Sequence, residues 1–288
     1  LGSASSGEQK NFGKDAGYYT LIFDKRRRRT MIHFVGAGPG AEDLITVRGQ
    51  RLLRRADVVI YAGSLVNPEL LKETKKCCKI YNSAHMTLEE VLEVMEEAQE
   101  KGLDTVRLHT GDPSLYGAVR EQMDRLEERG IPYESCPGVS SFGAAAAALN
   151  LEYTLPGLSQ SVVITRMEGR TPVPEREQVA AFAVHQATMV LFLSAGLLPE
   201  LTRELLAGGY EPDTPAAIVY KASWPEEACY PCTVGTLAQT GEAHGISKTA
   251  LIIVGEVVAH QNYQRSRLYD PEFTTGYRRG RNDEDQDH

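Results

Sequence analysis

The sequence lacks the features that would place the protein in a membrane or outside the cell. No stretch reaches the roughly eighteen consecutive apolar residues of a membrane helix, because the longest candidate, 189–198, is interrupted by Ser194 and Gly196. The five cysteines are an odd number, and no signal-peptide pattern accompanies them, which argues against a secreted disulfide scaffold. We therefore expect a protein of the reducing cytoplasm.

Excess positive charge and the motifs of several large enzyme classes are also missing. The formal net charge is -8 at pH 7, which disfavours a nucleic-acid-binding protein. The sequence contains no Ser-His-Asp pattern, EF-hand or G-x-x-x-x-G-K-[ST] loop, so hydrolases and kinases lack their required parts. Cys229 and Cys232 form a single C-x-x-C pair. Because a closed zinc site needs four ligands, we expect no metal site.

Short β-branched runs alternate with longer amphipathic segments, a pattern typical of an α/β fold with a largely parallel sheet. Helices are expected at 88–99, 116–128 and 144–149, the first of them with one apolar face. Two sheets are compatible with the number of strands. The expected strands are 32–35, 58–61, 105–108, 162–165, 189–193, 217–220 and 250–254.

Changes in composition divide the chain. Residues 1–30 are small and polar and then basic, which indicates a disordered extension introduced for expression, or alternatively a nuclear-localisation or heparin-type motif. We expect one α/β domain at 31–150 and a second at 161–262. The Pro- and Gly-containing segment 151–160 is the expected linker, and 263–288 is expected to be a partly disordered tail.

A glycine-rich turn at 34–41, FVGAGPGA, directly follows the first expected strand. It satisfies the G-x-G-x-x-[GA] pattern of dinucleotide-binding turns. However, Pro39 removes an N–H where a pyrophosphate needs donors, and Asp57 lies at the wrong end of the second strand to contact a ribose. An NAD(P)-dependent oxidoreductase, a purely structural turn and a non-enzymatic binding protein all stay open on this evidence.

Two further segments follow strand ends, where α/β sheets place their ligands. In 109–117, HTGDPSLYG, Asp112 either accepts hydrogen bonds from a ribose hydroxyl or an ammonium, or caps the next helix. In 136–143, CPGVSSFG, Ser140 and Ser141 either bind a ligand carboxylate at a helix N-terminus or act as the N-cap. Each segment alone leaves both interpretations open.

Together, in this order, the three segments resemble the tetrapyrrole methylase family, with its V-G-x-G-P-G start, G-D-P loop and P-G-[IV]-[ST] turn, over nearly all of 31–260. YAGSLV at 61–66, the segment 109–117 and TRMEGRTP at 165–172 are similar to the members that methylate C-11 of precorrin-4 or cobalt-precorrin-4 on the route to cobalamin. Members acting on precorrin-2, precorrin-3B or uroporphyrinogen III are the alternative within the family.

The resemblance implies two α/β domains with the active site in the cleft between them, and a homodimer. The net charge and the lack of a long apolar run lead us to expect no nucleic-acid or membrane partner. It implies S-adenosyl-L-methionine as the methyl donor and S-adenosyl-L-homocysteine as the product. By motif position the cofactor contacts are expected at Pro39, Thr110, Gly111, Asp112, Leu115, Ser140, Ser141, Leu193, Ser194 and Ala222.

A precorrin carries several carboxylates, which an acidic protein must bind through local positive charge. Because the Debye length at physiological salt is about 8 Å, a few nearby arginines outweigh the distant net charge. We expect Arg166, and secondarily Arg48, to bind these carboxylates. Asp112 and His109 are the candidate proton handlers, although no carboxylate pair or Cys-His arrangement demands a general base.

Overall fold

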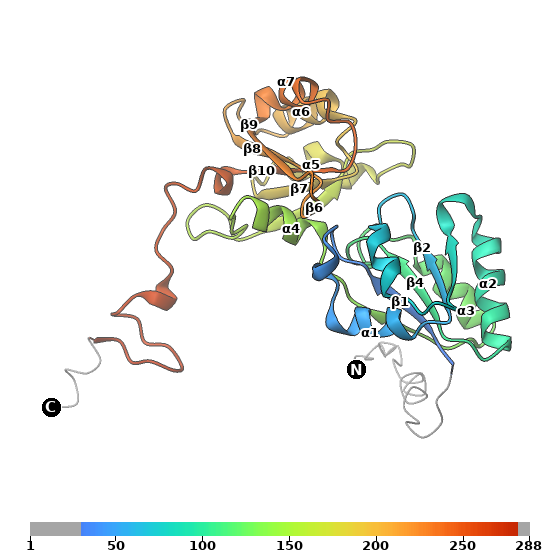
Figure 1. Cartoon of the computed structure of the whole chain (residues 1–288). Helices are drawn as coiled ribbons and strands as arrows, with labels where there is room; N and C mark the ends of the chain where they lie inside the picture. The colour runs from blue at the N-terminus through green and yellow to red at the C-terminus, as the bar shows by residue number, and fades with distance from the viewer. Residues whose placement is uncertain (1–29, 282–288) are drawn as a thin grey trace, which may run out of the picture.

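The computed structural model describes residues 30–281. These residues form two α/β units, each built on its own five-stranded sheet (Figure 1). Residues 1–29 and 282–288, which contain most of the expected N-terminal extension and the end of the expected tail, lie outside the described residues. Among residues 30–281, no helix combines the length and the apolar character needed to cross a bilayer.

The first sheet is entirely parallel, as the sequence pattern predicts, with the strand order β3-β2-β4-β1-β5. Its central strands are buried on both faces, which explains their continuous apolar runs. The prediction named three of these strands and implied β5 before the turn at Pro137. The five strands are β1 (Ile32–Gly36), β2 (Val58–Tyr61), β3 (Lys79–Asn82), β4 (Thr105–His109) and β5 (Tyr133–Cys136).

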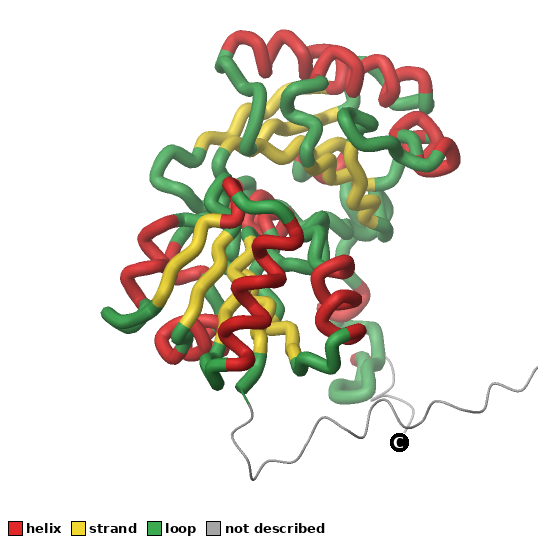
Figure 2. The backbone as a smooth tube through the Cα atoms, turned by 90° about the vertical axis from the view of Figure 1, so that its right-hand side faces the viewer, coloured by secondary structure: helices red, strands yellow, loops and turns green. Residues whose placement is uncertain are grey.

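Helices cover both faces of this first sheet (Figure 2). α1 (Val47–Arg55) and the short helix η3 (Pro68–Glu73) pack on one face. α2 (Leu88–Glu100) and α3 (Arg120–Glu128) pack on the other. The prediction for α2 is confirmed: a capping box starts the helix, and its apolar side is buried against the sheet.

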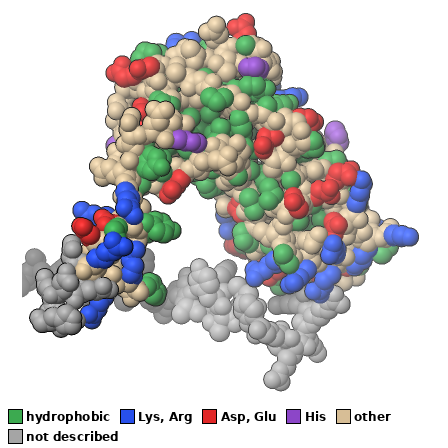
Figure 3. All heavy atoms as spheres, turned by 60° about the vertical axis from the view of Figure 1, so that its left-hand side comes forward, with side chains coloured by type: hydrophobic (Ala, Val, Ile, Leu, Met, Phe, Trp, Pro, Cys, Tyr) green, Lys and Arg blue, Asp and Glu red, His purple; other side chains and the backbone are tan. Residues whose placement is uncertain are grey.

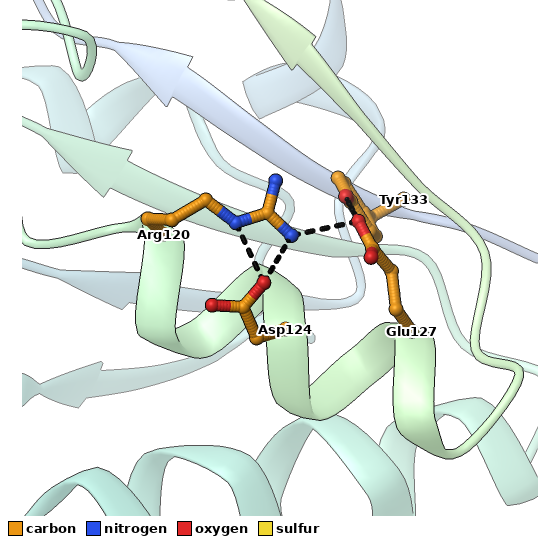
Figure 4. A network of polar contacts seen from close by, with 4 residues as sticks. All are labelled: Arg120, Asp124, Glu127 and Tyr133. Atoms are coloured by element: carbon orange, nitrogen blue, oxygen red, sulfur yellow. Dashed lines mark hydrogen bonds and ion pairs between the residues drawn. The ribbon is translucent and has the colours of Figure 1, made fainter. Parts of the chain in front are cut away.

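Helix α3 is shorter than the expected helix at 116–128. It begins at Arg120 rather than at 116, because Tyr116 and Ala118 have φ values of 56° and 49° and form a turn. Once started, α3 is held to β5 by the ionic network shown in Figure 4. Arg120 bonds to Asp124 at 2.6 Å and to Glu127 at 2.7 Å, and Glu127 also accepts a hydrogen bond from the Tyr133 hydroxyl.

The second sheet has the order β6-β7-β10-β8-β9 and is mostly antiparallel. Only β6 and β7 pair in parallel, so the expectation of largely parallel pairing is wrong here. The physical reason is the short β8–β9 connection at 221–227, which permits only an antiparallel neighbour. The strands are β6 (Val162–Arg166), β7 (Thr188–Phe192), β8 (Pro215–Tyr220), β9 (Ala228–Thr233) and β10 (Ala250–Val254).

Four helices accompany the second sheet. α5 (Val179–Ala183), α6 (Leu198–Ala207) and α7 (Leu237–Ala243) cover one face. The other face receives α4 (Ser141–Ala148), whose Ala144 and Ala145 pack against the central strands. The expected linker at 151–160 follows α4, whereas the buried side of this helix belongs to the second core. The division at 151–160 itself stays a prediction.

The segment after η7 (Glu256–Ala259) extends away from the second sheet (Figures 1 and 3). It contains one short helix, η8 (Arg267–Tyr269), and is organised around Arg278, whose guanidinium donates to the carbonyl oxygens of Leu268 and Asp270. Lys and Arg side chains gather on this segment in Figure 3. The basic residues are Arg265, Arg267, Arg278, Arg279 and Arg281.

Candidate active site

The first sheet has a topological switch point between its neighbouring strands β1 and β4. The chain leaves β1 towards β2 through α1, on one face, and leaves β4 towards β5 through α3, on the opposite face. Diverging connections of this kind open a crevice at the carboxyl ends of the strands, where open α/β sheets bind ligands. The glycine-rich turn and the loop 110–112 lie at this point.

Three loops meet at this switch point through glycine backbones. The amide of Gly111 donates to the carbonyl of Gly38 at 2.8 Å, and Gly38 donates back at 3.3 Å. A Cβ on Gly36 would lie 2.5 Å from the Gly111 oxygen, and a Cβ on Gly138 would lie 2.1 Å from the same atom. These distances leave no room for any side chain. The glycines therefore serve close packing of the loops after β1, β4 and β5.

Asp112 joins the loop after β4 to the loop after β5. Its Oδ2 accepts a hydrogen bond from the Gly138 amide at 2.8 Å, while its Oδ1 accepts from the amide of Ser114 at 2.8 Å and from the Ser114 hydroxyl. Partial burial acts to raise the pKa of Asp112, but the hydrogen bonds from Ser114 and Gly138 outweigh it and lower the pKa below its ordinary value. The side chain is therefore a carboxylate at neutral pH.

Replacing Asp112 by asparagine tests this fastening. An amide has one acceptor oxygen where the carboxylate has two, so either Gly138 or Ser114 loses its acceptor. We expect the free energy of unfolding to fall by about 1–2 kcal/mol at pH 7, measured by urea denaturation. Because a lowered pKa stabilises the fold only while the group is ionised, the difference from wild type should shrink below about pH 4. A difference independent of pH would contradict the assignment.

His109 occupies a different environment. It is 4% exposed, its ring stacks on Phe34 in the layer beneath α2 and α3, and its Nε2 has no hydrogen-bond partner among the described residues. Burial, assisted by the charge of Arg107, lowers the pKa of His109 to about 3. The imidazole is therefore neutral at physiological pH, and this geometry does not favour the proton-handling role predicted for His109.

Arg107 lies on the same face of β4, and burial lowers its pKa to about 10. Its guanidinium bonds to Gln122 Oε1 at 3.1 Å and to the Ile60 carbonyl at 3.2 Å. No ion pair among residues 30–281 includes it. We assign Arg107 a structural role. Its buried guanidinium is satisfied by neutral acceptors, and the side chain points into the layer between sheet and helices, away from the carboxyl rim.

Several predicted cofactor residues fit a ligand at this rim. A Cβ on Gly111 would make ordinary van der Waals contact with the backbone at the start of α4, 3.6 Å from the Ser141 nitrogen, and the φ of 60° at Gly111 favours glycine. Thr110 Oγ1 is buried without a partner in the described part of the chain. Ser140 precedes α4 but makes no side-chain cap bond, and the amides of Gly143 and Ala144 already donate to the Ser140 carbonyl, so the amides of Ser141 and Phe142 are the donors that α4 leaves for a ligand. Leu115 lies in the same loop, its amide bonded to the Asp112 carbonyl.

The remaining predicted cofactor contacts lie at the carboxyl ends of β7 and β8. Leu193 is 64% exposed and leaves β7 with a φ of 52°. Ser194 is fully buried, where its hydroxyl donates to the Phe192 carbonyl at 2.6 Å and accepts from the Met167 amide at 2.9 Å. Ala222 packs in the core against α4. Of these three, only Leu193 has an exposed side chain, whereas Ser194 and Ala222 are buried.

Arg166 ends β6 at the same rim. Its guanidinium donates to the carbonyl oxygens of Met167, Thr171 and Pro172 at 2.8–3.2 Å and so folds the following loop. Its charge also acts on Tyr116, although burial is the larger influence and raises the pKa of that phenol. Arg166 therefore stands close to a tyrosine of the first domain. Arg48, by contrast, is exposed on α1, and its side chain makes no hydrogen bond or ion pair with any other residue in the range 30–281.

The carboxyl rims of the two sheets face each other. β6, β7 and β8 run in one direction, because β10 is antiparallel to both β7 and β8. Their ends meet the first rim at two places: the Tyr116 ring lies 5.4 Å from that of Phe192, and Trp224 Nε1 donates to the Pro39 carbonyl at 3.0 Å. The sequence analysis missed Tyr116, Phe192 and Trp224. The single tryptophan of the sequence, in the loop that follows the expected strand 217–220, was the available signal.

A separate polar cavity of about 220 Å³ opens at the opposite end of the first sheet. It is lined in part by Asp57, whose carboxylate accepts hydrogen bonds from Lys75 and from the Asp104 amide. These contacts are structural, and Asp57 precedes β2, too far from the switch point to bind a ribose there. Within residues 30–281 no cluster of three or more His, Cys, Asp or Glu side chains is arranged to hold a metal ion.

Comparison with known proteins shows the family of this chain. Residues 31–238 match the family model of the Tetrapyrrole (Corrin/Porphyrin) Methylases. The chain is 52% identical over 245 residues to the cobalt-precorrin-4 C(11)-methyltransferase of Methanocaldococcus jannaschii, covering 85% of this chain and 95% of that one. These matches cover both sheets of the α/β fold and show that the protein is a methyltransferase. The chain belongs to the tetrapyrrole methylases.

Solved structures share the architecture. The X-ray structure of a cobalt precorrin-4 methyltransferase, a cobalamin biosynthetic enzyme, superimposes with a TM-score of 0.78 at 45% identity, over 79% of this chain and 95% of that one. A uroporphyrin-III C-methyl transferase from Thermus thermophilus, complexed with S-adenosyl homocysteine, gives a TM-score of 0.68 at 28% identity over 80% and 100% of the chains. The similarity thus spans both sheets.

Proposed function

We propose that the protein transfers a methyl group from S-adenosyl-L-methionine to C-11 of precorrin-4 or cobalt-precorrin-4, releasing S-adenosyl-L-homocysteine and the corresponding precorrin-5. The observation that carries the proposal is the junction of three glycine loops at the switch point, opposite the rim formed by β6, β7 and β8. The similarity to the Methanocaldococcus jannaschii enzyme supports the choice of substrate.

The chemistry asks the protein mainly to hold two molecules in line. A sulfonium donor carries its own activating charge and leaves as a neutral thioether, so the chain needs no nucleophile of its own. Fixing a reacting carbon close to the methyl group, with orbitals aligned, supplies on the order of 7–11 kcal/mol through proximity and orientation. Two rims that approach one another from separate sheets are suited to that task.

The residues divide between the two ligands. Thr110, Gly111 and the amides that begin at Ser141 would hold the cofactor on the first rim, with Leu193 covering it from the second. The ionised carboxylate of Asp112 positions this loop and can accept a further hydrogen bond from the ligand. Arg166 would bind the carboxylates of the macrocycle through the donors that its own loop leaves free.

Calorimetry tests the cofactor. We expect S-adenosyl-L-homocysteine to bind with micromolar affinity or better, and NAD and NADP to show no heat of binding, because Pro39 removes a phosphate donor and the acidic residue for the ribose is absent from the end of β2. Tight binding of either nicotinamide cofactor would overturn the proposal in favour of an oxidoreductase.

The position of methylation has its own experiment. The protein is incubated with each purified corrinoid intermediate and a ¹³C-labelled methyl donor, and the new methyl group is located by NMR. We expect label at C-11 of precorrin-4 or its cobalt complex. Label on an earlier precorrin or on uroporphyrinogen III would agree with the family but contradict the proposed substrate.

We further propose that the enzyme acts as a cytoplasmic homodimer. The five cysteines are all free thiols in the structure, which suits a reducing compartment. Family resemblance is the argument for the dimer. Sedimentation equilibrium should return twice the chain mass of 31.7 kDa, and a monomer at micromolar concentration would contradict this part of the proposal.

A further inference from the structure

The loop between β8 and β9 reaches from the second domain onto the glycine-rich turn of the first. Trp224 Nε1 donates to the Pro39 carbonyl at 3.0 Å, and the amide of Ala41 donates to Ser223 Oγ at 3.1 Å. The partners are 185 and 182 positions apart in the sequence. Two adjacent residues of one domain thus hold both ends of a three-residue stretch of the other.

The indole also fills the space that Gly40 leaves. A Cβ at this position would lie 2.2 Å from Cδ1 and Nε1 of Trp224, so any side chain here would displace the ring. From the other side, Asn67 Nδ2 donates to the Gly40 carbonyl at 2.8 Å. The stretch 39–41 is therefore held by its own domain and by the opposite one at the same time.

The loop that presents the indole has an unusual backbone. Lys221 and Ser223 both have positive φ, 45° and 69°, without being glycine. Such conformations persist only where surrounding contacts fix them, and they concentrate at functional positions. Here the Trp224 amide bonds to the Lys221 carbonyl at 2.9 Å, and Glu227 accepts from the Ser223 amide at 2.5 Å. These bonds fix the turn and aim the ring at Pro39.

We propose that Trp224 is a positioning residue for cofactor binding, acting through the Pro39 carbonyl and the packing on Gly40 as a latch between the two domains. The inference rests on the proposed function and on Pro39 as one of the cofactor contacts expected from the sequence. A ligand that contacts both rims binds best when the rims are held together, so the latch and the cofactor favour the same arrangement of domains.

The variant Trp224→Phe removes the Nε1 donor and keeps an aromatic ring over Gly40. We expect the dissociation constant for S-adenosyl-L-homocysteine, measured by calorimetry, to rise about fivefold, the factor that corresponds to one lost hydrogen bond. Ser223→Ala, which removes the acceptor for Ala41 and leaves the indole in place, should act in the same direction. Tyr263→Phe is the matched control, because Tyr263 is half exposed and distant in sequence from both rims, and its affinity should equal that of wild type.

Tryptophan fluorescence gives a second measurement. If Trp224 had only a structural role, its emission would not change when the ligand binds. Trp224 is the single tryptophan of the sequence, so tryptophan emission reports on the latch alone. Adding S-adenosyl-L-homocysteine to the wild-type protein should change this emission and saturate at the calorimetric dissociation constant. The Ser223→Ala variant should give the same change, displaced to higher ligand concentration.

The outcomes separate the latch from the function. Wild-type affinity in both Trp224→Phe and Ser223→Ala, or an emission that ligand leaves unchanged, would overturn the latch while leaving the methyltransferase proposal intact. A wild-type protein that does not bind S-adenosyl-L-homocysteine would instead overturn the proposed function, and the latch with it. Should Trp224→Phe fail to fold, Ser223→Ala carries the comparison.

Discussion

Replacing Gly138 by alanine is expected to lower the free energy of unfolding by about 1–3 kcal/mol, the usual cost of forcing atoms into a packed site. The added Cβ would lie 2.1 Å from the Gly111 oxygen and 2.7 Å from the Gly36 Cα. Both neighbours are backbone, so neither can turn away as a side chain would. Relief requires moving the loop that carries Asp112, whose carboxylate also bonds to the Gly138 amide.

The same substitution should weaken cofactor binding about tenfold or more, because the displaced loops are those that border the ligand. Urea denaturation and calorimetry with S-adenosyl-L-homocysteine measure the two effects. Gly143→Ala is the matched control: no atom lies within 4 Å of the added Cβ, and the residue is inside α4. Alanine there should stabilise the protein by about 0.5–1 kcal/mol. If both variants behaved alike, the packing of the three loops would not be what fixes Gly138.

Removing the charge of Arg166 should have the largest effect on the tetrapyrrole. In Arg166→Ala we expect its dissociation constant to rise about 10- to 100-fold, the equivalent of losing a charged hydrogen bond. The affinity for S-adenosyl-L-homocysteine should change less than twofold, since the predicted cofactor contacts do not include Arg166. Isothermal titration with each ligand gives the two constants. Equal loss of both affinities would count against a substrate-specific role.

Because Arg166 also folds the loop 167–172, a second variant is needed to separate charge from shape. Arg166→Lys keeps the charge but cannot reproduce a planar fork that reaches three carbonyl oxygens. Recovery of tetrapyrrole affinity in the lysine variant would assign the effect to charge. Arg203→Ala, at an exposed position on α6, controls for the general loss of one positive charge and should bind both ligands normally.

The prediction of individual strands succeeded where periodicity and burial agree. β1, β2 and β4 are buried on both faces and appear in the sequence as short apolar runs. β3 and β9 were missed, because they are edge strands with exposed or half-buried residues and contain lysine or proline. Strand direction in the second sheet was also mispredicted, since pairing depends on which strands become neighbours and not on the composition of any one of them.

Site residues show the same division. The sequence identified the loop 110–112 and the pair Ser140 and Ser141 because they follow strand ends in a recognised order. It did not distinguish Asp112, whose carboxylate is held at the rim, from His109, whose ring turns into the opposite layer. His109 still belongs to β4 and points to one face of the sheet, whereas Asp112 lies in the loop that follows. Only the packing of Phe34 against His109 reveals that the imidazole is buried and neutral.

By itself, the order of residues determined the α/β class and the family, because those properties depend on local spacing and on motifs within short segments. The three-dimensional arrangement alone decided which loops touch, that α4 joins the second core, and that Trp224 rests on Gly40. Such contacts join positions far apart in the chain. Their strength depends on distance and burial, which no linear pattern encodes.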